Sequence, residues 1–222
     1  MSGQQNKTVT VINYGLSNLL SVRHALEHFG AEVHIADTPA DVLTARALVL
    51  PGVGAFRDGM EGLRRLGLVE PIQRQAAAGT PLLGICLGMQ MLFEESEEFG
   101  LHSGLGLIPG RVVRIPESDV HGVPQRVPHI NWAPLYPATG RDPRTGFAGT
   151  ALADVQPGQE CYFIHSYEAR PRHDADRLAD TCYGGRMVCA AAARGSVLGT
   201  QFHPEKSGPV GLSIIGNFIR QL

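Results

Sequence analysis

The sequence predicts a single α/β domain over residues 1–222, with a mostly parallel central sheet flanked by helices and a mixed or antiparallel β extension in its second half. Two observations predict this class. In the first half, continuous apolar runs alternate with segments whose apolar residues recur at helical spacing. After about residue 104, short β-like runs are separated by glycine and proline. No internal repeat or low-complexity linker divides the 222 residues, which suffice for a sizeable core.

The elements of the first half follow from their residues in order. Strands are expected where β-branched and apolar residues dominate, at 7–13, 31–36, 45–56 (ending in a glycine-rich loop) and 80–86. Helices are expected at 19–29, ahead of the helix stop Gly30, and at 57–66 and 69–78. This alternation predicts parallel strands that are covered by helices on both faces.

The second half is expected to consist of strands and loops with one closing helix. The acidic run "EESEE" at 94–98 is interpreted as a solvated helix end, and 137–158 as a loop. The last residues regain a helical stripe, which is formed by Leu212, Ile215, Ile219 and Leu222.

The composition is typical of a globular protein and argues against several classes of function. Hydrophobic residues make up 43% of the chain and charged residues 18%, and the net charge of -2 includes no block of like charges. Neither a nucleic acid nor a membrane surface is therefore expected as a partner. The sequence shows no apolar signal core and no apolar run of 18 residues, which predicts a cytoplasmic protein.

Cysteine and histidine spacing predicts neither disulfides nor a metal site. The four cysteines form no C-x-x-C pair, which fits a reducing compartment. Among the histidines outside the motifs discussed below, only His24 and His28 are spaced like ligands on a helix, and they lack a third ligand.

The stretch "GICLG", residues 84–88, carries the strongest chemical signal. A cysteine between glycines, at an expected strand-to-helix turn, matches the sharp turn on which hydrolases place a nucleophile. The backbone N–H of Leu87 would then contribute to an oxyanion hole, and the new helix N-terminus would favour negative charge on the Cys86 sulfur. A small buried core thiol explains these five residues about equally well, because free cysteine is among the most buried residue types.

A base and an orienting group for Cys86 are found in "GTQFHPEKSG", residues 199–208. His203 and Glu205 follow an apolar run two residues apart, so the carboxylate can bond the far nitrogen of the imidazole. Pro204 restricts the backbone between them. A surface turn is the simpler interpretation of His-Pro-Glu in isolation, but the chain order Cys, His, Glu favours a triad.

The loop "PGVGAF", residues 51–56, is the third element. Gly52 and Gly54 lie at the end of an expected parallel strand, where their backbone N–H groups can point at a developing oxyanion. A phosphate-binding loop competes with this interpretation but is weakened, because no complete phosphate-binding motif is present. A plain structural turn is a further alternative for either glycine.

Two further stretches carry weaker signals. "YFIHSY" at 162–167 is expected to place His165 and Tyr167 on one face of a strand with Ser166 opposite, and a lone histidine there is more often structural than catalytic. Trp132, the only tryptophan, is either a core residue or an exposed residue near a site.

Together these motifs resemble a class I, triad-type glutamine amidotransferase domain, and the resemblance covers essentially the whole chain. Within that group they are similar to the glutaminase subunits of imidazole glycerol phosphate synthase. The segments that carry this closer similarity are "INYGLSNLLSV", "PGVGAF", "GICLGMQMLFEESEE", "PHINW", "YFIHSY" and "TQFHPEKSG".

The resemblance implies a role for each matching residue. Cys86 would attack the side-chain amide of glutamine and release ammonia, while His203 moves the proton and Glu205 orients His203. The oxyanion hole would be formed by backbone groups of Val53, Gly54 and Leu87. The glutamine would be held by Gln90 and by the backbone around His165, Ser166 and Tyr167.

The resemblance also implies a partner protein and no cofactor. Ammonia would pass to the cyclase subunit of a heterodimer, which makes imidazole glycerol phosphate and an aminoimidazole-carboxamide ribotide in histidine biosynthesis. The residues implied to face the cyclase are Asn18, Trp132, Tyr162 and Lys206.

Two departures from the family pattern keep alternatives open. The first strand ends in Asn13-Tyr14-Gly15 where the family usually has Asp-Tyr-Gly, and 129–133 reads His-Ile-Asn-Trp-Ala where the family usually has His-Met-Gly-Trp-Asn. Both lie toward the expected partner surface, so a paralogous glutaminase feeding another synthase, such as one for surface sugars, is an alternative. A free-standing cysteine hydrolase and a silent binding subunit are further alternatives, although the intact triad argues against the silent subunit.

Overall fold

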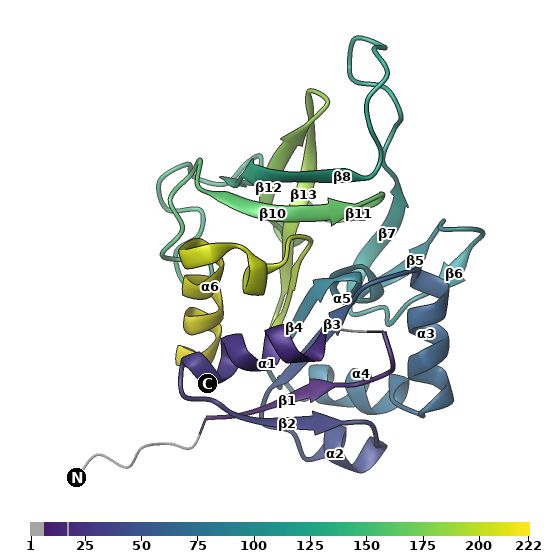
Figure 1. Ribbon diagram of the computed structural model, residues 1–222, viewed down its shortest axis with the longest axis vertical. Helices are drawn as coiled ribbons and strands as arrows, with labels where there is room; N and C mark the ends of the chain where they lie inside the picture. Colours follow the sequence, from purple (N-terminus) through teal and green to yellow (C-terminus); the bar gives the residue numbers. More distant parts are fainter. Residues whose placement is uncertain (1–6, 17) are drawn as a thin grey trace.

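The centre of the protein is an eight-stranded sheet of order β2-β1-β3-β4-β14-β13-β12-β9, seen in a computed structural model that describes residues 7–16 and 18–222 (Figure 1). The first five strands of this order are parallel. Their bounds are β2 (Glu32–Ala36), β1 (Thr8–Ile12), β3 (Leu48–Gly52), β4 (Leu82–Cys86) and β14 (Val197–Thr200). The expected parallel sheet is therefore confirmed.

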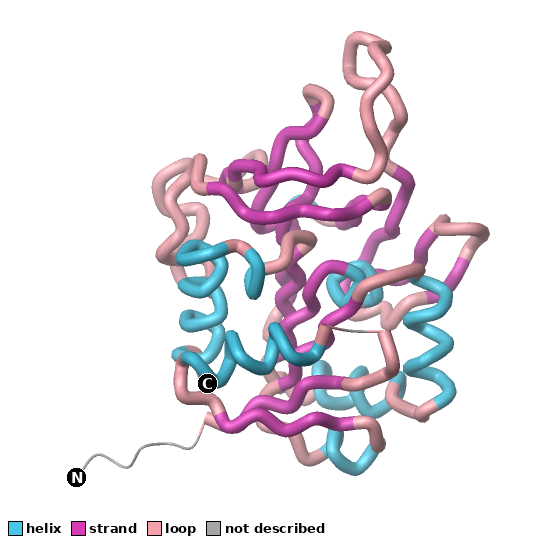
Figure 2. The backbone as a smooth tube through the Cα atoms, in the orientation of Figure 1, coloured by secondary structure: helices cyan, strands magenta, loops and turns pink. Residues whose placement is uncertain are grey.

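The second half of the chain extends this sheet with antiparallel strands, as predicted. These strands are β13 (Arg186–Arg194), β12 (Arg177–Tyr183) and β9 (Tyr136–Pro137). A four-stranded sheet contains β11 (Tyr167–Pro171), β7 (Ile108–Arg114), β5 (Phe93–Ser96) and β6 (His102–Ser103). An antiparallel pair is formed by β8 (His129–Pro134) and β10 (Glu160–His165), which Figure 2 shows beyond one end of the parallel strands.

Helices cover both faces of the parallel strands because successive residues of a strand point to opposite faces. Val49 of β3 belongs to one hydrophobic core, whereas its neighbours Leu48 and Leu50 belong to the other. The first core includes residues of α1 (Leu19–His28) and α6 (Gly208–Arg220). The second core includes residues of α2 (Pro39–Leu43), α3 (Phe56–Arg65), α4 (Val69–Ala77) and α5 (Leu87–Met91).

The ends of the described chain are tied together across the first core. Lys7 donates a hydrogen bond from Nζ to the backbone carbonyl of Ile219, at 2.8 Å. In the described part of the chain, none of the helices combines the length and apolar character that crossing a membrane requires.

The interpretation of residues 94–98 as a solvated helix end is wrong. Helix α5 ends at Met91, and the chain enters β5, which pairs in parallel with β7. Phe93 and Ser96 are fully buried in this pairing. Strand pairing with a segment more than ten residues later thus overrides the local helical pattern.

The segment 137–158 is mostly loop, as expected, but it also contributes to the core. Phe147 and Leu152 are buried in the first core, to which α6 also contributes, and the side chain of Asn217 in α6 donates a hydrogen bond to the carbonyl of Ala151, at 3.0 Å. The stretch is therefore held in place by packing although it contains little regular structure.

Candidate active site

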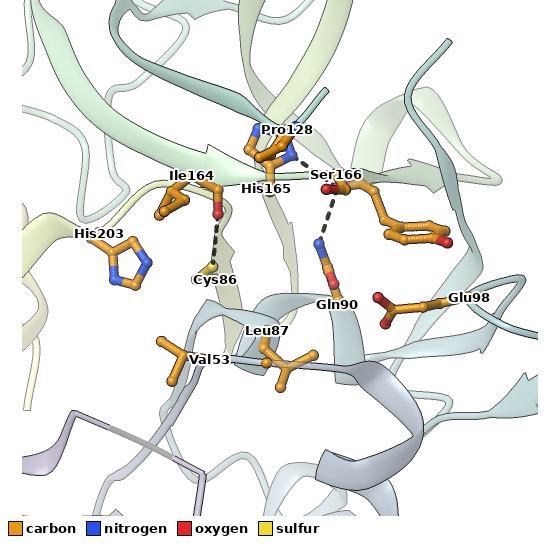
Figure 3. Close-up of a pocket in the computed structure, with 12 residues that line it drawn as sticks. Val53, Cys86, Leu87, Gln90, Glu98, Pro128, Ile164, His165, Ser166 and His203 are labelled. Carbon is orange, nitrogen blue, oxygen red and sulfur yellow. Dashed lines mark hydrogen bonds between the residues drawn. The ribbon is translucent and has the colours of Figure 1, made fainter. Parts of the chain in front are cut away.

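The chemistry-bearing segments meet at one edge of the sheet because β3, β4 and β14 run parallel and end together. The loop after β3 carries Val53 and Gly54, β4 ends at Cys86, and His203 follows β14. All four residues line one cavity of about 270 Å³ (Figure 3). Ligand sites of open α/β sheets lie at this carboxyl edge.

The backbone at Cys86 forms the sharp turn that the sequence predicts. Cys86 has φ of 56° and ψ of -110°, in the positive-φ region that residues other than glycine rarely adopt. Gly88 permits the turn, because a Cβ at this position would lie 1.7 Å from the carbonyl oxygen of Leu50. Such strain is typical of functional positions and places the sulfur at the edge of the cavity.

His203 and Glu205 form a buried pair beside Cys86. Nδ1 of His203 lies 2.8 Å from Oε1 of Glu205, and the two side chains are only 3% and 1% exposed. The other ring nitrogen, Nε2, is turned towards the Cys86 thiol (Figure 3). Burial opposes a charge on the imidazole, but the contacts with Cys86 and Glu205 outweigh it and raise the pKa of His203 to about 9. The arrangement favours a protonated imidazole between Cys86 and Glu205.

The backbone N–H of Val53 is not aimed at Cys86 in this conformation. It donates a hydrogen bond to the carbonyl of Leu16, at 3.1 Å, while Val53 lines the cavity and is 40% exposed. The next residue, Gly54, has φ of 101°. The oxyanion role of Val53 therefore stays a prediction, and it requires this peptide to turn over. Gly54 and Leu87, the other expected donors, line the same cavity, Leu87 at the start of α5.

Gln90 forms hydrogen bonds with Tyr167 in the cavity wall and with Gln201, a residue that the sequence motifs did not indicate. Nε2 of Gln90 donates to the carbonyl of Tyr167 and to Oε1 of Gln201, both at 3.0 Å. Gln201 is fully buried, and its Nε2 lies 3.8 Å from the Cys86 sulfur. A polar residue at the end of an apolar strand, two positions before His203, was the available signal.

Glu98 is a second missed residue. It is the one carboxylate among the described residues that line the cavity, and its Oε2 accepts a 2.6 Å hydrogen bond from the backbone N–H of Phe56. Burial raises the pKa of Glu98, and the Phe56 N–H acts in the opposite direction. The last residue of the acidic run thus faces a cavity rather than bulk solvent.

The stretch "YFIHSY" lies at the cavity as a broken strand rather than a continuous one. Strand β10 ends at His165 and β11 begins at Tyr167, and His165, Ser166 and Tyr167 all line the cavity. Ser166 is therefore not set apart on an opposite face. Nδ1 of His165 lies 2.8 Å from the carbonyl of Tyr167, to which it donates.

The second nitrogen of His165 is occupied by another histidine. Its Nε2 lies 3.2 Å from Nδ1 of His129, which is the donor because the Nδ1 proton of His165 is already committed to Tyr167. Burial lowers the pKa of His165 to about 3 and that of His129 to about 4. The neutral pair supports the structural interpretation of His165, and His203 is the imidazole poised to carry a proton.

The residues predicted to face a partner lie outside the cavity. Trp132 is 46% exposed and stands opposite Tyr162 across β8 and β10, with ring centroids 6.0 Å apart. Asn18, just before α1, and Lys206, in the short 3-10 turn Pro204–Lys206, are also exposed. Asn18 lines a small crevice together with Val53 and Glu205, so it lies next to the triad.

Comparison with solved structures identifies the architecture. The protein superposes on a crystal structure described as a glutamine amidotransferase with a TM-score of 0.70 and 18% identity, covering 96% of this chain and 99% of that one. It superposes on the structure of PurLQS from Thermotoga maritima with a TM-score of 0.69 and 18% identity, covering 96% and 98%. At these identities the similarity shows a shared fold.

Sequence comparison narrows the relationship. The model of the family "Glutamine amidotransferase class-I" matches residues 10–222. The imidazole glycerol phosphate synthase subunit HisH 1 of Legionella pneumophila (strain Lens) is 47% identical over 214 residues, which cover 96% of this chain and 99% of that protein. The HisH subunit of Syntrophotalea carbinolica is 48% identical over 211 residues, covering 95% and 98%. With such identity sustained over nearly the full length, the chain belongs to the class-I glutamine amidotransferase family and, within it, to the HisH subunits of imidazole glycerol phosphate synthase.

Proposed function

We propose that this protein hydrolyses glutamine to glutamate and ammonia. The observation that supports this proposal most directly is the strained turn at Cys86. Cys86 lines one cavity with His203, and the imidazole of His203 is paired with the buried Glu205. The Cys86 thiolate attacks the side-chain carbonyl carbon of glutamine, and the C–N bond breaks as His203 protonates the leaving amine. The products are ammonia and a glutamyl thioester. Water, deprotonated by His203, then cleaves the thioester, releasing glutamate and restoring the thiolate and the protonated His203.

The cavity supplies matching groups for an amino-acid substrate. Glu98 is suited to the α-ammonium group, because an ammonium in a partly buried site needs an opposite charge. Ser166 and Tyr167, whose backbone groups are predicted to hold the glutamine, line the same cavity. Both amide hydrogens of Gln90 are engaged by Tyr167 and Gln201, so Oε1 is the Gln90 atom that remains to accept a hydrogen bond from the substrate.

The oxyanion hole requires a rearrangement of the loop after β3. With its N–H on the Leu16 carbonyl, Val53 cannot stabilise the tetrahedral intermediate, and losing one such donor typically slows catalysis about 10²- to 10³-fold. We therefore propose that the protein alone is nearly idle and that partner binding near Asn18 and Val53 turns this peptide towards Cys86. The shared crevice of Asn18, Val53 and Glu205 supports a coupling between the partner face and the triad.

We further propose that the ammonia passes to a cyclase subunit, in a cytoplasmic heterodimer that makes imidazole glycerol phosphate and an aminoimidazole-carboxamide ribotide. The 47% identity to a protein named as a subunit of imidazole glycerol phosphate synthase supports this assignment. An exposed apolar face on β8 and β10 offers a docking surface; it is formed by Ile130, Trp132, Tyr162 and Ile164.

Four free cysteines are consistent with the reducing environment of the cytoplasm. The match over residues 10–222 and the Lys7–Ile219 bond support one domain.

The alternative partner is a different synthase served by a paralogous glutaminase. Ile130 and Asn131, which depart from the family pattern, are both exposed on β8, where they can contact a partner.

One assay separates these partners. Glutamine hydrolysis is measured for the protein alone, with the cyclase, and with the cyclase and its nucleotide substrate. We expect the protein alone to hydrolyse glutamine slowly. In the complete complex we expect stimulation on the order of 10²-fold or more, which is the effect of restoring one oxyanion donor. Full activity of the isolated protein, or failure to bind the cyclase, would contradict the proposal.

Replacing Glu98 with glutamine is expected to raise the KM for glutamine by roughly 10- to 100-fold with a smaller change in kcat. A hydrogen bond to a charged group contributes about 1.5–3 kcal/mol, and the amide oxygen in the variant still accepts from the Phe56 N–H. The matched control is Glu97→Gln, which removes the same charge from an exposed side chain paired with Arg111. Equal KM values for the two variants would exclude Glu98 from ammonium binding. The readout is steady-state kinetics in the stimulated complex.

A further inference from the structure

Gln201 lies directly beside the nucleophile, although the proposed reaction assigns it no role. It is one residue beyond Thr200, which pairs with Ile85 in the parallel register of β14 and β4, so Gln201 is next to Cys86 across the sheet. Its backbone N–H donates to the carbonyl of Ala190, at 2.8 Å. The residue is fully buried. Its main chain is therefore fixed by the sheet, and its side chain has little freedom to move.

The hydrogen bonds determine which end of the Gln201 amide faces the sulfur. The carbonyl of Tyr167 can only accept, so the group of Gln90 that contacts it must be the NH₂ group. The same NH₂ group contacts the Gln201 side chain at 3.0 Å, which requires an oxygen there. The remaining end of the Gln201 amide, 3.8 Å from the Cys86 sulfur, is consequently an N–H donor. One backbone carbonyl thus fixes the orientation of two side-chain amides in series.

The two polar neighbours of the Cys86 sulfur favour opposite protonation states, one the thiol and the other the thiolate. The carbonyl of Ile164, at 3.9 Å, can accept from a thiol S–H but repels a thiolate (Figure 3). The N–H of Gln201 bonds a thiolate more strongly than a thiol, because charge-assisted hydrogen bonds are stronger. The N–H therefore offsets the Ile164 carbonyl when the sulfur is ionised.

We propose that Gln201 is a further catalytic residue of this site, whose side-chain N–H holds the Cys86 sulfur as a thiolate, while Gln90 and the Tyr167 carbonyl keep the amide in the donating orientation. This inference rests on the proposed role of Cys86 as nucleophile. It makes Gln90 a positioning residue for the nucleophile in addition to its predicted contact with substrate.

The test measures alkylation of Cys86 by iodoacetamide across pH in the full-length protein, because this reaction needs neither glutamine nor a partner. Gln201→Met keeps the length of the side chain but removes the donor. We expect Cys86 to react on the order of tenfold more slowly near pH 7, with the difference closing at high pH. Peptide mass spectrometry reports Cys86 and the exposed Cys182 in one sample, so Cys182 is an internal reference.

A second variant and a control separate the donor from packing. Gln201→Glu retains an oxygen for Gln90 but places a carboxylate beside the sulfur, so its alkylation should be slower still than in Gln201→Met. This variant carries the test if Gln201→Met does not melt cooperatively. Gln73→Met removes an exposed glutamine outside the cavity, whose side chain donates to the Leu105 carbonyl, and should leave Cys86 reactivity unchanged.

The outcomes distinguish the inference from the function on which it rests. Unchanged pH profiles in both Gln201 variants would overturn the role of Gln201 while leaving the nucleophile in place. If Cys86→Ala keeps the glutamine hydrolysis of the wild-type complex, the proposed nucleophile itself is wrong, and the inference falls with it.

Discussion

Replacing Cys86 with alanine is expected to reduce glutamine hydrolysis by the stimulated complex by on the order of 10³- to 10⁵-fold, because no other described thiol or hydroxyl nucleophile sits at the elbow beside His203. The turn itself should persist, although alanine at φ of 56° is as strained as cysteine. Because no thioester can form, the loss should appear in kcat rather than in KM. Steady-state release of glutamate measures it.

The same variant distinguishes a loss of glutamine hydrolysis from a failure to assemble with the cyclase. If the cyclase accepts ammonia directly, added ammonium salt should restore product formation in the Cys86→Ala complex to the wild-type level. Cys182→Ala, which removes an exposed thiol, is the matched control and should keep full glutamine-dependent activity. Glutamine hydrolysis that survives in Cys86→Ala would rule out the thiol mechanism.

Replacing Gly88 with alanine is expected to destabilise the fold by more than about 4 kcal/mol, the range reached by severe backbone or core disruption. The added Cβ would lie 1.7 Å from the carbonyl oxygen of Leu50, a backbone atom of the central strand β3. Neither side can yield without separating α5 from the sheet. Urea unfolding followed by circular dichroism gives the free energy of unfolding, and we expect little folded protein at 25 °C.

Gly59→Ala is the matched comparison for Gly88→Ala. Gly59 also lies in a helix, but the atom nearest to its added Cβ, at 2.8 Å, is the sulfur of the flexible Met91 side chain. Alanine also improves helix propensity over glycine by about 1 kcal/mol. The free energy of unfolding should therefore stay within about 1 kcal/mol of wild type. Similar losses in both variants would mean that α5 can shift away from β3.

The parallel half of the fold was predictable because its signals are local. Each buried strand is a continuous apolar run, and the residues that separate runs are glycines and prolines with a direct steric role. The elbow at Cys86 and the His203–Glu205 pair were also readable, since both depend on neighbours within two residues. Their meeting at one edge follows from parallel topology alone.

Glu98 and Gln201 were missed because their roles depend on contacts remote in the chain. In the sequence, Glu98 is part of an acidic run. It lines the cavity only because β5, just before it, pairs with β7. Gln201 acquires a defined orientation only through Gln90 and Tyr167. Likewise, nothing in "PGVGAF" indicates that the Val53 N–H is held by Leu16. A backbone conformation of this kind is a tertiary property.

The bond between Val53 and Leu16 has a consequence for how the subunits are produced. Glutamine is a shared nitrogen donor, and an unpaired glutaminase that ran freely would drain the pool and release ammonia into the cell. If the loop after β3 rests in this bonded conformation whenever the partner is absent, surplus copies of the chain are harmless. The two subunits then need not be expressed in equal amounts, because the unassembled protein hydrolyses almost no glutamine.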